Sequence, residues 1–136
     1  LILICGHYEG FDARIYDLAD RIVSVGDFVL TGGEIPAMLV VDATARMLAG
    51  VLGDAASAPT DSFFEDLLGC PQYTRPREFE GKAVPDVLLS GDHAAIARWR
   101  REQALLMTLR HRPELLANAK LSQADRDFLA EQEKRR

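Results

Sequence analysis

The chain opens on five apolar residues, Leu1–Cys5, with no initiator methionine before them. A short apolar run of this kind is typical of a β-strand that is buried on both faces of a parallel sheet. The backbone of such a strand needs neighbouring strands as hydrogen-bond partners. We therefore expect an α/β fold, and we expect the chain to be a fragment of a longer protein.

Composition excludes several other classes of protein. Of the 136 residues, 48% are hydrophobic and 27% are charged, which is the balance of a folded domain and not of a disordered chain. The two cysteines, Cys5 and Cys70, are too few for a disulfide scaffold. The longest apolar stretch, Ile35–Val41, is too short to span a membrane. We expect a soluble, reduced, cytoplasmic protein without a membrane partner.

The first part of the chain alternates between strand and helix patterns. Phe11–Ala19 predicts a short helix, and the β-branched segment Arg21–Val25 predicts a second strand. An apolar loop follows and ends in the glycine pair Gly32-Gly33. Glu34–Leu48 then predicts a helix that is apolar on nearly all sides. Such a helix is buried or is covered by a partner subunit.

A change in composition separates a second part. Residues 53–60 are small, polar and interrupted by proline, which predicts a flexible linker. Asp61–Glu65 predicts the first turn of a new helix, and 70–76 predicts an extended loop. The segment Ser90-Gly91-Asp92 is placed to cap a long helix that runs to about Arg110, and Ser122 to cap a last helix.

The long helix is expected to have an apolar stripe and a polar face. The stripe comprises Ile96, Trp99, Leu106 and Leu109, and the polar face carries Arg98, Arg101 and Glu102. We therefore expect the second part to be a small, mostly α-helical domain.

Charge is distributed unevenly between the two parts. The formal net charge of −5 argues against a protein that binds nucleic acid over its whole surface. Residues 1–66 hold 3 basic and 11 acidic side chains, whereas residues 67–136 hold 13 basic and 10 acidic ones. This asymmetry indicates either that only the C-terminal part contacts a polyanion or that its arginines form a solvated helix face.

Two glycine-containing loops are candidates for a ligand site. The loop that ends in Gly32-Gly33 lacks the GxGxxG fingerprint and the Walker lysine, so neither a dinucleotide nor a triphosphate is supported. It suits an adenine ring that meets backbone amides, or it is only a tight turn. The loop Gly6–Glu9 follows a predicted strand end, where Tyr8 and Glu9 offer an aromatic wall and a carboxylate, or it is an ordinary βα turn.

Three charged residues are candidates for chemistry. Asp42 and Arg46 lie four residues apart on the apolar helix, either as an interface ion pair or with Arg46 placed to stabilise negative charge. Asp61 follows the linker and is either a helix cap or a general base brought in by a mobile segment.

Taken together, the strings along the chain resemble the bacterial tRNA (guanine-N1)-methyltransferases of the SPOUT class. The resemblance covers essentially the whole chain and rests, in order, on Cys5–Gly10, Val25–Ala37, Gly50–Gly53, Asp61–Phe63, Tyr73–Pro76, Val87–His93 and Arg98–Arg100. It departs from the usual pattern at His7 and Phe28, where we expect Arg and Tyr more often. It implies that the first strands of the methyltransferase domain precede Leu1.

The resemblance implies a fold, a reaction and a set of site residues. Residues 1–52 would be the C-terminal part of a trefoil-knot methyltransferase domain, 53–60 a linker and 61–136 a helical tRNA-binding domain. The protein would be a homodimer that transfers a methyl group from S-adenosyl-L-methionine to N1 of guanine at tRNA position 37. Asp61 would be the general base and Arg46 the partner of the guanine carbonyl. The cofactor pocket would be lined by Gly6, Tyr8, Glu9, Val25, Gly26, Phe28, Leu30, Gly32 and Gly33.

These residue types suit that reaction. Guanine N1 carries a proton that a carboxylate can accept, and the negative charge that grows at O6 is matched by a guanidinium. The sequence does not predict a metal site, although carboxylates such as Glu9 and Asp61 are of a type that binds Mg²⁺. Two other interpretations remain open: a non-catalytic RNA- or protein-binding fragment with an incomplete cofactor site, and an enzyme that uses another small adenine ligand.

Overall fold

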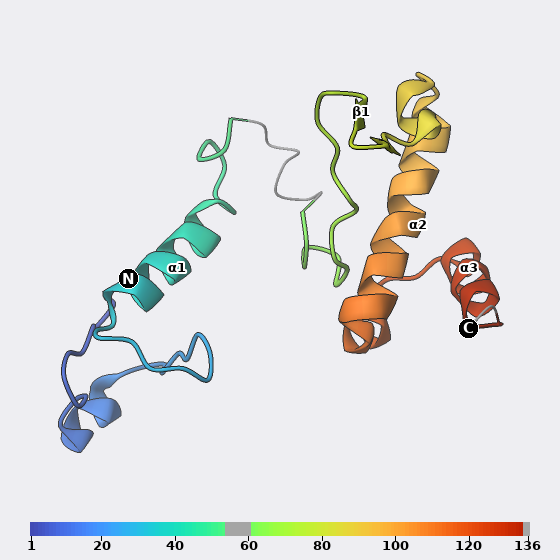
Figure 1. Ribbon diagram of the computed structural model, residues 1–136. Coiled ribbons are helices and arrows are strands. Elements are labelled where there is room, and N and C mark those ends of the chain that lie inside the picture. The colour runs from blue at the N-terminus through green and yellow to red at the C-terminus, as the bar shows by residue number, and fades with distance from the viewer. Residues whose placement is uncertain (54–60, 135–136) are drawn as a thin grey trace. The chain divides into compact units, whose positions relative to one another are not determined.

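The computed structural model describes residues 1–53 and 61–134 (Figure 1). The chain divides into two units, Leu1–Ala55 and Ala56–Arg136. The predicted linker 53–60 lies outside the described residues, apart from Gly53.

Two helices form the regular structure of the first unit. The 3₁₀ helix η1, Ala13–Leu18, begins after Asp12, whose side chain accepts a hydrogen bond from the Arg14 backbone N–H at 3.0 Å. The helix α1, Glu34–Ala45, begins directly after Gly33. The predicted helices over 11–19 and 34–48 are therefore confirmed, although α1 ends before Leu48.

The two predicted strands of this unit are wrong. Residues 1–5 and 21–25 are irregular, and within residues 1–53 the ladder pairing is limited to one antiparallel bridge between His7 and Gly32. A strand requires a neighbour for its backbone groups, and neither segment has one among the described residues. The apolar pattern identified segments that are suited to a sheet, but it did not indicate which strands would pair with them.

Apolar side chains of the first unit remain exposed. None of residues 1–53 is buried. On α1, the side chains of Met38, Leu39 and Val41 are 63%, 52% and 49% exposed. The described part of this unit thus has no core of its own, and the burial of α1 against a partner stays a prediction.

A short hairpin opens the regular structure of the second unit. Strands β1, Glu78–Phe79, and β2, Lys82–Ala83, pair antiparallel. Glu80 and Gly81 between them both have positive φ, +50° and +75°, as a type I′ turn requires. Sequence analysis did not predict this hairpin, because a strand of two residues is too short for alternation to be recognised.

The helices of the second unit begin where their capping residues predict. Asp92 accepts hydrogen bonds from the N–H groups of Ala94 and Ala95 at 3.0 Å and starts α2, His93–His111. At α3, Gln123–Lys134, Ser122 and Asp125 exchange side-chain to backbone hydrogen bonds of 2.9 and 3.2 Å. The short 3₁₀ helices η2, Asp86–Leu89, and η3, Pro113–Ala117, flank α2.

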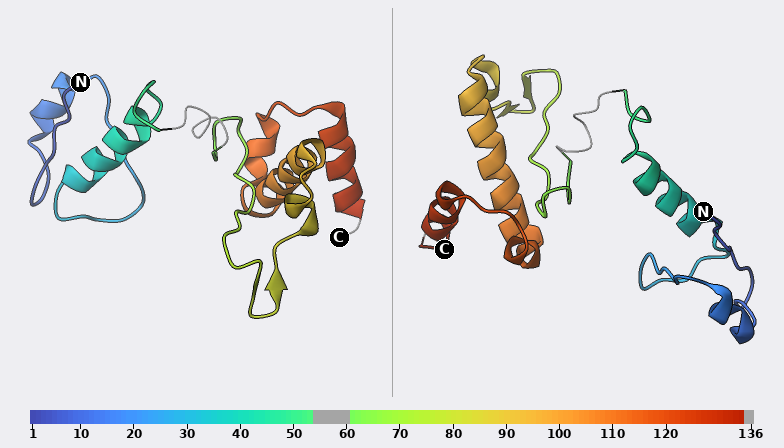
Figure 2. Two further views of the ribbon diagram at one scale, coloured as in Figure 1. Left: turned by 90° about the horizontal axis from the view of Figure 1, so that it is seen from above. Right: turned by 180° about the vertical axis from the view of Figure 1, so that it is seen from behind.

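The core of the second unit lies between α2, α3 and the segment that precedes the hairpin. Figure 2 shows α3 beside the C-terminal half of α2. Leu67, Leu105 and Leu129 form the buried cluster. Leu105 and Thr108 are fully buried, although neither belongs to the predicted stripe of α2. Arg101, predicted on the polar face, instead points its guanidinium at Asp125 of α3.

Thr108 joins α2 to the segment before the hairpin. Its hydroxyl donates to the Ala104 carbonyl at 2.7 Å and accepts a hydrogen bond from the Leu68 N–H at 2.9 Å. A buried hydroxyl needs such partners, because an unpaired polar group in the interior is costly. This one side chain therefore places Leu68 relative to the helix.

We expect Thr108→Val to destabilise the second unit by about 1–3 kcal/mol, because the Leu68 N–H loses its acceptor while the volume is kept. Thr108→Ser keeps the hydroxyl and serves as the matched control. Thermal unfolding followed by circular dichroism measures both, and equal melting temperatures for Val and Ser would contradict this role.

An ion pair links α2 to α3. Partial burial acts to raise the pKa of the Asp125 carboxyl, but hydrogen bonds from Arg101 and Ser122 outweigh it and hold that pKa below its ordinary value of 3.8. The Arg101 Nη2–Asp125 Oδ2 distance is 3.1 Å, and Asp125 is 7% exposed. The ionised carboxylate thus stabilises the folded state wherever the pH lies above the carboxyl's pKa in the unfolded chain.

The stability of the second unit should fall as the pH drops below 3.8 towards the lowered pKa of Asp125. Asp125→Asn removes the titrating group, so the variant should be less stable at neutral pH and lose less stability on acidification. Urea unfolding at neutral and acidic pH measures both quantities. An equal acid-induced loss in the wild type and in Asp125→Asn would contradict the assignment.

Candidate functional site

The first unit brings two of its glycine-containing loops together. The Gly33 N–H donates to the Gly6 carbonyl at 2.9 Å, next to the bridge between His7 and Gly32. A Cβ added at Gly33 would lie 2.8 Å from the Cα of Cys5, so the close approach of the two backbones requires glycine at this position. We call this contact the glycine junction, formed by Gly6, His7, Gly32 and Gly33.

A pocket adjoins the glycine junction. It is lined by His7, Tyr8, Val29, Leu30 and Thr31, which combine aromatic, aliphatic and polar surfaces. Tyr8 adopts a positive φ of 58°. Tyr8 and Leu30 belong to the predicted cofactor residues, and Gly6, Gly32 and Gly33 form the backbone contact beside them. Five of the nine predicted residues therefore lie at the junction or in its pocket.

The other predicted cofactor residues lie elsewhere on the two loops. Glu9 is exposed on the turn that follows Tyr8, and Val25 is half-buried. Phe28 folds over Gly26, where an added Cβ would lie 2.3 Å from the Phe28 ring. Their role in a cofactor site remains a prediction.

One ion pair at the junction was not predicted. The Nε2 of His7 contacts the carboxylate of Glu34, the first residue of α1. The backbone N–H of Glu34 lowers the pKa of this carboxyl, and the hydrogen bond from His7 lowers it further. Sequence analysis considered Glu34 only as the first residue of the apolar helix.

The second unit carries Asp61 on a tight turn and not on the predicted helix. Phe63 and Asp66 have φ values of +72° and +56°, which an α-helix cannot contain. The Phe63 N–H donates to the Leu67 carbonyl at 2.7 Å and closes the turn. The Ser62 N–H donates to Asp61 Oδ1 at 2.8 Å, so the carboxylate caps its own turn. We call residues 61–69 the Asp61 loop.

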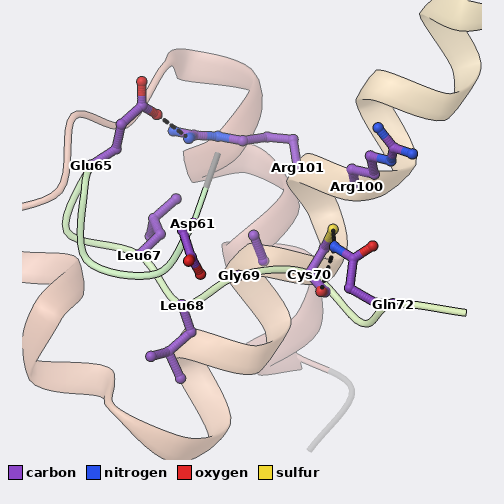
Figure 3. A pocket seen from close by; sticks show the side chains of 10 residues that line it. Asp61, Glu65, Leu67, Leu68, Gly69, Cys70, Gln72, Arg100 and Arg101 are labelled. Atoms are coloured by element: carbon purple, nitrogen blue, oxygen red, sulfur yellow. Dashed lines mark hydrogen bonds and ion pairs between the residues drawn. The ribbon is translucent and has the colours of Figure 1, made fainter. Parts of the chain in front are cut away.

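A pocket lies between the Asp61 loop and α2 (Figure 3). Asp61 and Glu65 supply carboxylates from the loop, and Arg100 and Arg101 supply guanidinium groups from α2. The remaining lining residues are Leu67, Leu68, Gly69, Cys70, Gln72 and Ala104. A carboxylate beside guanidinium groups is able to accept a proton from a bound polar ring and to hold negative charge nearby.

Sequence reasoning missed Glu65, Cys70 and Gln72 as lining residues of this pocket. Glu65 and Arg101 are 36 residues apart, and no spacing rule relates them. The arginine cluster in the sequence was the one available signal, and it indicated a polyanion surface without identifying the member that turns inward.

Arg46 follows α1 as its C-capping residue, and its backbone N–H donates to the Asp42 carbonyl at 3.2 Å. Arg46 belongs to the first unit and Asp61 to the second. Their joint action in one site stays a prediction.

Residues 1–53 and 61–134 contain neither a candidate metal site nor a helix able to span a membrane. Within these ranges, no cluster of three His, Cys, Asp or Glu side chains is arranged to hold a metal ion. The helices in the same ranges are all too short or too polar to cross a membrane.

Comparison with known proteins gives one consistent result. The family model described as tRNA (Guanine-1)-methyltransferase TrmD matches residues 1–118. A relative from Lactobacillus helveticus, named tRNA (guanine-N(1)-)-methyltransferase, is 56% identical over 131 residues, which cover 96% of this chain and 55% of the relative. Proteins of the same name from Syntrophotalea carbinolica and Moorella thermoacetica are 59% and 60% identical, with 96% of this chain and 53% of each relative covered.

The chain thus spans about half the length of the curated relatives it matches. The family match includes the glycine junction, α1, the Asp61 loop and all of α2. On these grounds the chain belongs to the tRNA (guanine-1)-methyltransferase family.

Proposed function

We propose that the protein containing this chain transfers a methyl group from S-adenosyl-L-methionine to N1 of guanine at position 37 of tRNA. The observation that carries the proposal is the family match across both the glycine junction and the Asp61 loop. The alternative of a non-catalytic binding fragment is less favoured, because this match includes the residues proposed for chemistry as well as those proposed for binding. An enzyme acting on another adenine ligand has no support from the relatives' names.

The residues at the glycine junction fit an adenine-containing cofactor. Gly33 lets the two loops approach closely, and Val29 and Leu30 line the adjoining pocket with apolar surface. Gly6, Tyr8, Leu30, Gly32 and Gly33 would hold the cofactor, with Glu9, Val25, Gly26 and Phe28 completing the loops around it. The cofactor supplies the electrophilic methyl group; the chain binds, orients and shields it.

In this proposal, Asp61 is the general base that accepts the proton from guanine. N1 of guanine is protonated at neutral pH, and a carboxylate within hydrogen-bond reach accepts that proton as the methyl group is transferred. Arg46 is proposed to stabilise the negative charge that develops at O6.

The tRNA is proposed to contact the second unit. Arg98, Arg100 and Arg110 of α2 are exposed and are therefore accessible to phosphate groups. Trp99 lies beside Tyr73 with ring centroids 6.2 Å apart, which offers an aromatic surface near these arginines.

We further propose that the first unit is the C-terminal part of a SPOUT methyltransferase domain with a trefoil knot. The irregular segments 1–5 and 21–25 would pair with strands from the part of the full-length protein that corresponds to the uncovered part of the relatives. A homodimer in the cytoplasm completes the proposal, with the exposed apolar residues of α1 as the contact surface. The division into domains at 52 and 61 belongs to the same proposal.

Replacing Gly33 by Ala should abolish the binding of S-adenosylhomocysteine to the full-length protein, because the added methyl group would push the two loops of the junction apart. Gly53→Ala is the control, since an added Cβ there meets no atom within 4 Å. Isothermal titration calorimetry measures both affinities. Wild-type affinity in Gly33→Ala would remove the junction from the cofactor site.

Asp61→Asn should lower the methylation rate of the full-length enzyme by about 10²–10⁴-fold, because Asn keeps the size of the side chain but accepts no proton. The affinity for S-adenosylhomocysteine should stay unchanged. A single-turnover assay with tRNA measures the rate. Asn also caps turns well, so near-wild-type activity would mean that Asp61 has only its structural role.

A further inference from the structure

One guanidinium group connects the Asp61 loop to two helices. Arg101 Nη1 donates to Glu65 Oε2 of the loop at 3.0 Å. On its other side, Arg101 Nη2 donates to Asp125 Oδ2 at 3.1 Å and to the Lys120 carbonyl at 3.0 Å. Arg101 itself belongs to α2, so this side chain joins the loop, α2 and the start of α3.

We propose that Arg101 is a positioning residue for Asp61, acting through Glu65. The inference rests on the proposed role of Asp61 as general base. Arg101 does not act on the guanine; it fixes the segment that carries the base, so that the carboxylate is held at the position where it accepts the N1 proton.

The position of the contact along the loop supports this role. The buried Leu67 and the hydrogen bond from Leu68 to Thr108 attach the C-terminal end of the loop to α2 and the core. Near the start of the loop, the Arg112 guanidinium lies over the Phe63 ring, 5.7 Å from its centroid. Glu65 lies between these contacts, and its ion pair with Arg101 ties this part of the loop to α2. It sits between Phe63 and Asp66, the two residues with positive φ, so the ion pair holds the middle of the turn.

The geometry of the contact needs arginine. Three nitrogen atoms of Arg101 reach four acceptor atoms on three residues, since Nε also faces Asp125 Oδ1 at 3.4 Å. A lysine ammonium is a single point of charge and cannot span Glu65 and Asp125 with a planar fork. Partial burial acts to lower the pKa of Arg101, but Asp125 and Glu65 outweigh it and raise that pKa, so the group stays charged.

A substitution at Glu65 distinguishes the positioning of the Asp61 loop from the stability of the fold. Its side chain is 61% exposed, and an ion pair at such a site contributes little to the stability of the fold. A loss of activity in Glu65→Gln would therefore reflect the placement of the loop and not unfolding. Arg101→Lys tests the same contact from the helix, with some risk of destabilisation because Asp125 is buried.

The experiment compares single-turnover methylation rates of the full-length enzyme at saturating tRNA and S-adenosylmethionine. The variants are Glu65→Gln, Arg101→Lys, Asp61→Asn and the double variant Asp61→Asn/Glu65→Gln. Asp86→Asn is the control, because it breaks the exposed pair with Arg77, 2.8 Å long, in the same unit but outside the Asp61 loop. Melting temperatures and affinities for S-adenosylhomocysteine are measured for every variant.

We expect Glu65→Gln and Arg101→Lys to lower the rate at least about 10-fold, because a small misplacement of a catalytic group is costly. Affinity for S-adenosylhomocysteine should stay at the wild-type value, and Glu65→Gln should keep the wild-type melting temperature. In the Asp61→Asn background, Glu65→Gln should cause no further loss, since the group that it positions is already absent.

Two results would overturn the inference, and they differ from a failure of the proposed function. In the first, Glu65→Gln methylates as fast as the Asp86→Asn control while Asp61→Asn is strongly impaired. This result would refute the positioning role of Arg101 and leave the general base in place. Full additivity in the double variant would show that Glu65 acts independently of Asp61. A wild-type rate in Asp61→Asn would instead refute the general base itself, and the positioning role with it.

Discussion

The second unit depends on the buried face of α2. Leu105 supplies the centre of the apolar cluster, and Thr108, one turn further on, supplies the polar contact that holds Leu68. Because both side chains are fully buried, the segment from Asp61 to Gly69 and the helix α3 are both fixed against the same two turns of one helix. The candidate base, the pocket beside it and the arginine that connects them are all built on that face.

Sequence reasoning located the helices of this chain well and its strands badly. Helix starts are local events, and Asp92, Ser122 and Gly33 each mark one within a few residues. Strands are pairings, and the apolar character of Leu1–Cys5 contains no information about which segment lies next to it. The prediction of a helix from Asp61 was wrong for a third reason. Phe63 and Asp66 are non-glycine residues with a left-handed backbone conformation, which no sequence pattern predicts.

Sequence reasoning likewise predicted some residues of the candidate site and missed others. Resemblance to a family identified the glycines whose close approach the structure then displays, since Gly33 is packed against Cys5 and Gly6. It could not indicate that Arg101 turns inward while Arg98 and Arg100, its neighbours on the same helix, stay exposed. That distinction depends on Asp125, 24 residues away on α3, and therefore on tertiary packing.

None of residues 1–53 is buried, and this has a thermodynamic consequence. A segment that removes little apolar surface from water within its own chain gains little hydrophobic free energy from ordering, while the entropic cost of ordering is unchanged. In the proposed dimer, its order would be linked by mass action to the contact that covers those side chains. Substitutions on the apolar surface of α1 would accordingly change an association constant, whereas substitutions around Leu105 would change the free energy of unfolding of a single chain.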